Sequence, residues 1–200
     1  MEVKPIMNYE SLKTQITTEL KNRPRLLILG IGENRMGDDG IGQYISFYLG
    51  LECHCQNVRI INGGIVPEER LKEINDFRPE FLLVIDAISM NEPPGTVKLL
   101  DEKKMLNYLP ISSHSMPLPV FIDKIKQANP AITMKLLGIC PFSLQFLERY
   151  VLFAEDDYTL DDKDENLNIP FYAFNLTDQI KKIGAELIAL LKEVLKLYLD

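Results

Sequence analysis

The segment LLILGIGENRMGDDGIG at residues 26–42 constrains the fold more than any other part of the chain. Its first four residues are all apolar, which is the pattern of a strand buried on both faces of a parallel sheet. Gly30 and Gly32 follow, so the backbone can turn sharply where larger side chains would clash. Asp38 and Asp39 then open a helix, and one acidic residue at a helix N-terminus is ordinary capping. We therefore expect Asp38 to cap the helix and Asp39 to project into the crevice above the strand, where open α/β sheets bind ligands.

Strands and helices alternate along the rest of the chain. Continuous apolar runs predict further strands, and apolar residues at helical spacing or an initial proline predict helices. The expected strands are residues 57–61, 81–85, 96–100 (at a sheet edge) and 134–139, and the expected helices are residues 8–21, 67–77, 117–127 and 176–199. This alternation predicts a three-layer α/β/α sandwich around a mostly parallel, twisted sheet of about five strands.

Length and composition predict one domain. A chain of 200 residues with 46% hydrophobic content can bury one good core. Residues 1–200 are therefore expected to form a single α/β domain, with residues 1–23 as a helical extension packed on the outside and residues 147–170 as an acidic loop insertion. Within the insertion, the carboxylates of residues 155–165 lack the alternate spacing of an EF-hand, so we expect a solvated loop rather than a calcium site.

Charge and hydropathy argue against several classes of function. The formal net charge is −7 and the pI is about 5.0, which disfavours nucleic acid or an anionic membrane as the main partner. No apolar run approaches the roughly 18–20 residues of a membrane span, and the N-terminus lacks the basic-then-apolar layout of a signal peptide. The three cysteines are an odd number in a chain too long to need disulfide staples. We therefore expect a cytoplasmic protein without membrane insertion.

Two carboxylates and one imidazole stand where a site would form. Asp39 lies just past the first strand, Asp86 ends the strand at 81–85, and His114 lies in a polar loop before a helix. Because the carboxyl ends of parallel strands meet at one edge, these side chains can converge on a divalent metal and leave positions open for water or substrate. Each residue also has a purely structural interpretation. Asp39 could cap its helix, Asp86 could accept hydrogen bonds from loop amides, and His114 could be an ordinary surface residue.

Other motifs are weaker. Cys53-His54-Cys55 looks like a metal cluster, but adjacent residues cannot easily all face one ion, and no second ligand pair exists elsewhere. A dinucleotide site is disfavoured because Arg35 stands where the third glycine belongs and the second strand ends in Asn62 rather than an acid. A serine nucleophile would need a motif such as GxSxG, which is absent.

Taken together, these residues resemble the endopeptidases that mature the large subunit of nickel–iron hydrogenases. Five motifs match in the same order, over about residues 26–146, and the likeness is greatest to the branch serving membrane-associated, hydrogen-evolving enzymes. The motifs are Gly30-Ile31-Gly32 through Gly37-Asp38-Asp39-Gly40, Gly63-Gly64 with Pro67-Glu68, Leu83-Val84-Ile85-Asp86-Ala87, Ser113-His114-Ser115-Met116-Pro117-Leu118, and Leu137-Gly138-Ile139 with Pro141.

The resemblance implies an activity and a set of residues. Such enzymes remove a C-terminal extension from the large-subunit precursor once nickel is in place. The family's metal-contacting and catalytic residues carry over onto Asp39, Asp86 and His114. Nickel would be carried by the precursor as the recognition signal, with no permanently bound cofactor. Cleavage would be hydrolytic, with no covalent serine or cysteine step.

The chain departs from the family's pattern near the substrate. Glu33 stands where the family usually has Asn, and Asn62 where it often has Asp; together with Gly63 and Gly64, they are expected to contact the substrate. Cys140 replaces a common Gln. Two alternatives remain open: a non-catalytic nickel-binding checkpoint module on the same scaffold, and a nucleotide-binding α/β protein.

Overall fold

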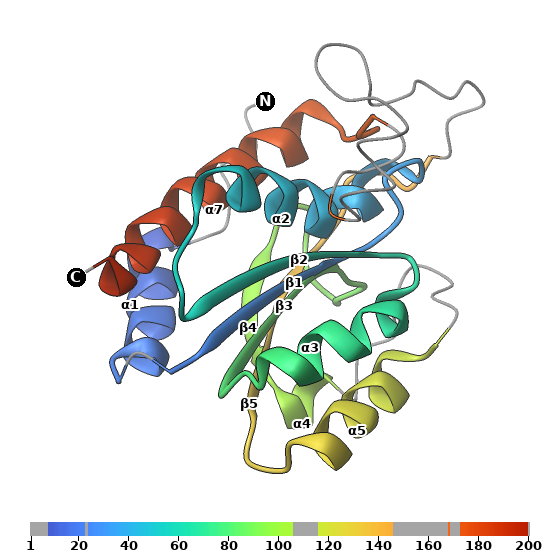
Figure 1. Cartoon of the computed structure of the whole chain (residues 1–200). Helices are drawn as coiled ribbons and strands as arrows, with labels where there is room; N and C mark the ends of the chain where they lie inside the picture. Colours follow the sequence, from blue (N-terminus) through green and yellow to red (C-terminus); the bar gives the residue numbers. More distant parts are fainter. Residues whose placement is uncertain (1–7, 23, 106–115, 146–167, 169–172, 200) are drawn as a thin grey trace.

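A five-stranded sheet in the order β2-β1-β3-β5-β4 forms the centre of the molecule (Figure 1). The computed structural model describes residues 8–22, 24–105, 116–145, 168 and 173–199. The strands are β1 Leu26–Ile31, β2 Val58–Gly64, β3 Phe81–Ala87, β4 Val97–Asp101 and β5 Thr133–Ile139. The α-helices are α1 Tyr9–Leu20, α2 Ile41–Glu52, α3 Leu71–Phe77, α4 Glu102–Met105, α5 Leu118–Ala128 and α7 Asp178–Leu195, and the 3-10 helices are η1 Gly37–Gly40, η2 Pro67–Arg70 and η3 Lys196–Tyr198.

The strand directions confirm the predicted fold class. β2, β1, β3 and β5 run parallel, and β4 pairs antiparallel with β5 at one edge. β1 and β3 are buried along their whole length, as their continuous apolar runs predict. Their carboxyl ends therefore lie side by side in the middle of one edge of the sheet.

Helices cover both faces of the sheet (Figure 1). α1, α2 and α7 pack on one face, and α3, α4 and α5 on the other. The apolar side of α1 (Leu12, Ile16 and Leu20) is buried in the same hydrophobic core as α2 and α7, and α1 contacts α7. The helix in the predicted N-terminal extension is therefore part of the helical layer on this face of the sheet. None of the described helices combines the length and apolarity needed to cross a bilayer.

The structure differs from the predicted element boundaries in a few places. β2 does not end at residue 61 but continues to Gly64, with a shift of register against the end of β1. The helix expected at 67–77 is split into η2 and α3, and the one-turn helix α4 follows β4 directly. Of the acidic insertion predicted at 147–170, only Asn168 lies within the described residues.

Candidate active site

A close contact between α2 and the sheet brings the two predicted site aspartates to the same edge. A Cβ placed on Gly42 would lie 2.2 Å from the backbone oxygen of Ile85 and 2.3 Å from that of Ile31. Only glycine fits, so the start of α2 rests directly on the ends of β1 and β3. η1, which carries Asp39, consequently contacts β3. Asp86 is the second-last residue of β3.

Asp39 and Asp86 are both buried at this edge, 0% and 1% exposed respectively. The Glu33 backbone N–H donates to Oδ2 of Asp39 over 2.7 Å. Gly32 has a φ of +137°, and a Cβ there would lie 1.9 Å from the backbone oxygen of Asp39, so the turn that delivers Asp39 needs glycine at this position. Buried carboxylates at the carboxyl ends of neighbouring strands are the usual setting of a functional site in α/β proteins.

The third predicted site residue, His114, lies outside the described residues. Within the described ranges, no three His, Cys, Asp or Glu side chains gather in a way that would hold a metal ion, and this includes Cys53-His54-Cys55. Two carboxylates with one imidazole would supply the oxygen and nitrogen donors that a borderline divalent ion such as nickel accepts. The metal role of Asp39, Asp86 and His114 therefore stays a prediction.

The prediction that Asp38 caps its own helix is wrong. Neither η1 nor α2 has a side-chain cap. Instead Oδ2 of the fully buried Asp38 accepts hydrogen bonds from the backbone N–H groups of Phe142 (2.8 Å) and Ser143 (3.0 Å). Thr177 donates its backbone N–H to Oδ1 (2.7 Å) and its hydroxyl to Oδ2 (3.1 Å). Asp38 thus joins the turn before α2 to the segment after β5 and to the N-cap of α7.

Glu33 is engaged with Arg35 rather than projecting alone. The Arg35 guanidinium donates from Nε to Oε1 of Glu33 over 2.8 Å and from Nη2 to Oε2 over 2.6 Å. Burial by itself raises the pKa of Glu33, but the hydrogen bonds and charge of Arg35 outweigh it and hold the pKa below its usual value. A substrate group reaching Glu33 would therefore meet a carboxylate and a guanidinium together.

Replacing Arg35 by Met should change how stability depends on pH. In the wild type the lowered pKa of Glu33 stabilises the fold above the ordinary value of 4.5, and this contribution is lost as the pH falls through the folded-state pKa. In Arg35→Met only burial and the backbone N–H of residue 35 still act on the Glu33 carboxylate, so the acid-dependent loss of stability should shrink, with a cost of about 1 kcal/mol at pH 7. Urea unfolding between pH 3 and pH 7 measures both, and identical pH profiles for the two proteins would contradict the assignment.

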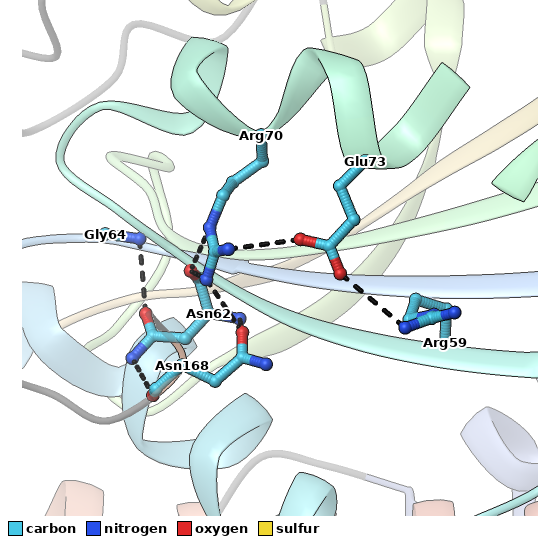
Figure 2. A network of polar contacts seen from close by, with 6 residues as sticks. All are labelled: Arg59, Asn62, Gly64, Arg70, Glu73 and Asn168. Carbon is cyan, nitrogen blue, oxygen red and sulfur yellow. Dashed lines mark hydrogen bonds and ion pairs between the residues drawn. The ribbon is translucent and has the colours of Figure 1, made fainter. Parts of the chain in front are cut away.

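Asn62 and the double glycine form the end of β2 rather than a loop beyond it. Asn62 is 6% exposed, and its Oδ1 accepts the backbone N–H of Gly64 over 3.2 Å. Figure 2 shows that Arg70 and Asn168 complete this group. Arg70 donates from Nε (3.2 Å) and Nη2 (3.0 Å) to the backbone oxygen of Asn62, and Asn168 accepts from both residues. Sequence reasoning missed Arg70 and Asn168. A charged residue in a helix and an amide in an acidic stretch are both ordinary on a solvated surface, so no sequence signal marks them as partners of Asn62.

None of the three cysteines is bonded to another, and two of them are poor nucleophiles. Burial raises the pKa of the Cys53 thiol, and burial likewise raises the pKa of Cys140. Because the thiolate is the attacking species, both thiols are less reactive than an ordinary cysteine near neutral pH.

Comparisons with known proteins agree with this arrangement. The family model described as HycI, hydrogenase maturation protease, matches residues 48–152, just over half of the chain. A Methanocaldococcus jannaschii protein, provisionally named a hydrogenase maturation protease, is 31% identical over 145 residues, 66% of this chain and 85% of the relative. Hydrogenase 3 maturation protease of Escherichia coli is 33% identical over 118 residues, 58% of this chain and 72% of the relative. In fold, the chain is similar to the crystal structure of a NiFe hydrogenase maturation protease HycI from Thermococcus kodakarensis, with a TM-score of 0.69 and 24% identity over 91% of this chain and 99% of the other. The chain belongs to the hydrogenase maturation protease family.

Proposed function

We propose that this protein is an endopeptidase that removes the C-terminal extension of a nickel–iron hydrogenase large-subunit precursor after nickel insertion. The single observation that carries the proposal is the family membership, seen both in the family model and in relatives more than 30% identical. A place in the cytoplasm goes with it, because the cysteines are unpaired thiols, as in a reducing compartment.

Asp39, Asp86 and His114 are the proposed site. Nickel would arrive with the precursor, and these three side chains would bind it as part of the substrate, so the enzyme needs no resident metal. Recognition of the ion would bring the scissile bond to the carboxyl edge of the sheet, where hydrolysis can use a water molecule activated there. The raised thiol pKa values of Cys53 and Cys140 support a mechanism without a covalent cysteine intermediate.

The substrate chain itself would lie beside Glu33 and the end of β2. Glu33 with Arg35 offers paired charges, and Asn62, Gly63 and Gly64 offer an amide side chain and backbone close to Gly30 of β1. These groups flank Asp39 and Asp86 along the same edge, so they are placed to orient the residues next to the cleaved bond.

The test is direct cleavage. The purified protein is incubated with large-subunit precursor loaded with nickel, and with the same precursor free of nickel, and the products are weighed by mass spectrometry. We expect the loaded precursor alone to lose the mass of a C-terminal peptide. If the protein binds the loaded precursor tightly and leaves its mass unchanged, a non-catalytic checkpoint role is correct instead.

A further inference from the structure

The outer edge of β2 presents backbone groups that no strand pairs with in the described structure. β2 is the last strand of the sheet on its side. Asn57 accepts a hydrogen bond from Leu26 of β1, so up to the register shift after Asn62 the odd-numbered residues face β1 and the even-numbered ones, Val58, Ile60 and Asn62, face outward. The backbone N–H groups of Val58 and Asn62 follow this rule, since each donates to a group outside the sheet. Ile60, which lies between them, has the same outward orientation.

At this edge, the side-chain amide of Asn168 accepts hydrogen bonds that the peptide group of a neighbouring strand could accept. Its side-chain oxygen Oδ1 accepts the backbone N–H of Asn62 over 3.0 Å and Nη2 of Arg70 over 2.8 Å. Its backbone oxygen accepts Nδ2 of Asn62 over 3.0 Å. Figure 2 shows these three donors directed at one residue from a distant part of the chain. The side-chain amide of Asn has the same donor and acceptor groups as a peptide bond. A carbonyl oxygen of an extended main chain could therefore accept the same two hydrogen bonds that Oδ1 of Asn168 accepts here.

The donors on the protein side are already fixed in place. Arg70 is 8% exposed, and its guanidinium also donates to the backbone oxygen of Asn62 and, from Nη1 over 3.1 Å, to Oε2 of Glu73. Glu73 in turn lies 3.8 Å from the guanidinium of Arg59. A peptide oxygen binding here would not have to order the arginine first, which lowers the entropic cost of binding.

A groove continues from Asn168 along the same edge. It has a volume of about 590 Å³ and lies between the later part of α2 and the first residues of β2. Phe47 and Leu51 form its apolar wall on α2, and Leu51 is 46% exposed. Val58 and Ile60 form the β2 side. An open strand edge beside apolar side chains is the arrangement that binds extended peptides by adding a strand to the sheet.

We propose that the β2 edge at Ile60 and Asn62, with Arg70, docks the extended C-terminal part of the precursor, and that Asn168 holds the position of one of its peptide units. This inference rests on the proposed function. Asn62 pairs with Gly30, and Gly30 pairs with Ile85, the residue before Asp86. A chain added outside β2 is three strand spacings from β3, about 14 Å, which about four extended residues span. A chain docked on β2 therefore reaches the candidate active site.

The first experiment removes the residue that holds this position. Asn168→Ala should lower KM for a nickel-loaded precursor about tenfold, because the incoming chain no longer displaces the two hydrogen bonds that Oδ1 of Asn168 accepts from Asn62 and Arg70. Asn91→Ala, an exposed Asn before β4 at the other edge of the sheet, is the matched control and should leave KM within about twofold. If Asn168 serves only to hold the fold together, Asn168→Ala lowers the melting temperature without lowering KM, and the inference is overturned.

The second experiment blocks strand addition. Ile60→Pro removes an outward N–H and obstructs the edge, so KM should rise about tenfold. Leu99→Pro makes the same change at an outward position of β4, on the opposite edge, and should leave KM unchanged. A folded Ile60→Pro with the wild-type KM overturns the inference, and if this variant fails to fold, Asn168→Ala decides. If the wild-type protein cleaves no precursor, the proposed endopeptidase function is overturned as well. If the wild type cleaves normally and both variants keep the wild-type KM, only the docking site is overturned.

Discussion

Asp86→Asn should abolish precursor cleavage, with a loss in rate of about 10³-fold or more. The amide keeps the size of the carboxylate but removes the charge that would bind nickel on the precursor. Asp86 is 1% exposed, and burying an amide costs less hydration than burying a carboxylate. The free energy of unfolding should therefore stay unchanged or rise, which is the behaviour of a residue kept for function at the expense of stability.

The variant is measured by mass spectrometry of the cleaved precursor and by urea unfolding of the protein. Asp39→Asn and His114→Ala should give the same loss of cleavage if the three residues form one site, because groups that act as a unit do not contribute additively. Asp123→Asn, at an exposed position on α5, is the matched control and should cleave normally. Normal cleavage by Asp39→Asn, Asp86→Asn and His114→Ala would show that the active site lies elsewhere.

The sequence was sufficient to predict the fold class and that Asp39 and Asp86 lie at the same edge of the sheet. Strands β1 and β3 are buried on both faces, so each is a continuous apolar run that cannot be mistaken for an amphipathic element. The end of such a strand in a parallel sheet is also where ligands bind, which is why Asp39 and Asp86 could be selected by position alone. The extension of β2 through Asn62-Gly63-Gly64 was not predicted, because glycines usually weaken a strand. Here they continue beside Gly30 and Ile31 of β1, so the backbones themselves make the contact.

Long-range polar contacts could not be predicted from local patterns. Asp38 looked like a helix cap because it precedes a helix, yet its partners lie 104, 105 and 139 residues further along the chain. Asn168 contacts Asn62 across 106 residues. Hydropathy and spacing describe an element and its immediate neighbours. Which loop amide ends up beside which carboxylate is decided by tertiary packing, and a single sequence carries no record of it.

Asp38→Ala should destabilise the protein by about 3–5 kcal/mol, far more than the loss of a helix cap, which costs about 1 kcal/mol. The carboxylate accepts four hydrogen bonds, from Phe142, Ser143 and twice from Thr177, and it is 0% exposed. Alanine leaves three partly buried backbone N–H groups without their acceptor, and each such group costs on the order of 1 kcal/mol or more. The melting temperature should fall by roughly 10 °C or more, as measured by calorimetry.

Two further variants separate this role from catalysis. Asp38→Asn should cost nearly as much, because the NH₂ end of an amide would meet donors where the carboxylate presents acceptors on both sides. Thr177→Val keeps the backbone N–H to Asp38 but loses the hydroxyl, which also accepts the N–H of Ile180 over 3.3 Å as the N-cap of α7, so about 1 kcal/mol is expected. Below its lowered melting temperature, Asp38→Ala should still cleave the precursor at a reduced rate, since Asp39 is the aspartate assigned to the site. An Asp38→Ala variant with wild-type stability and no cleavage would show instead that Asp38 is the aspartate that serves the reaction.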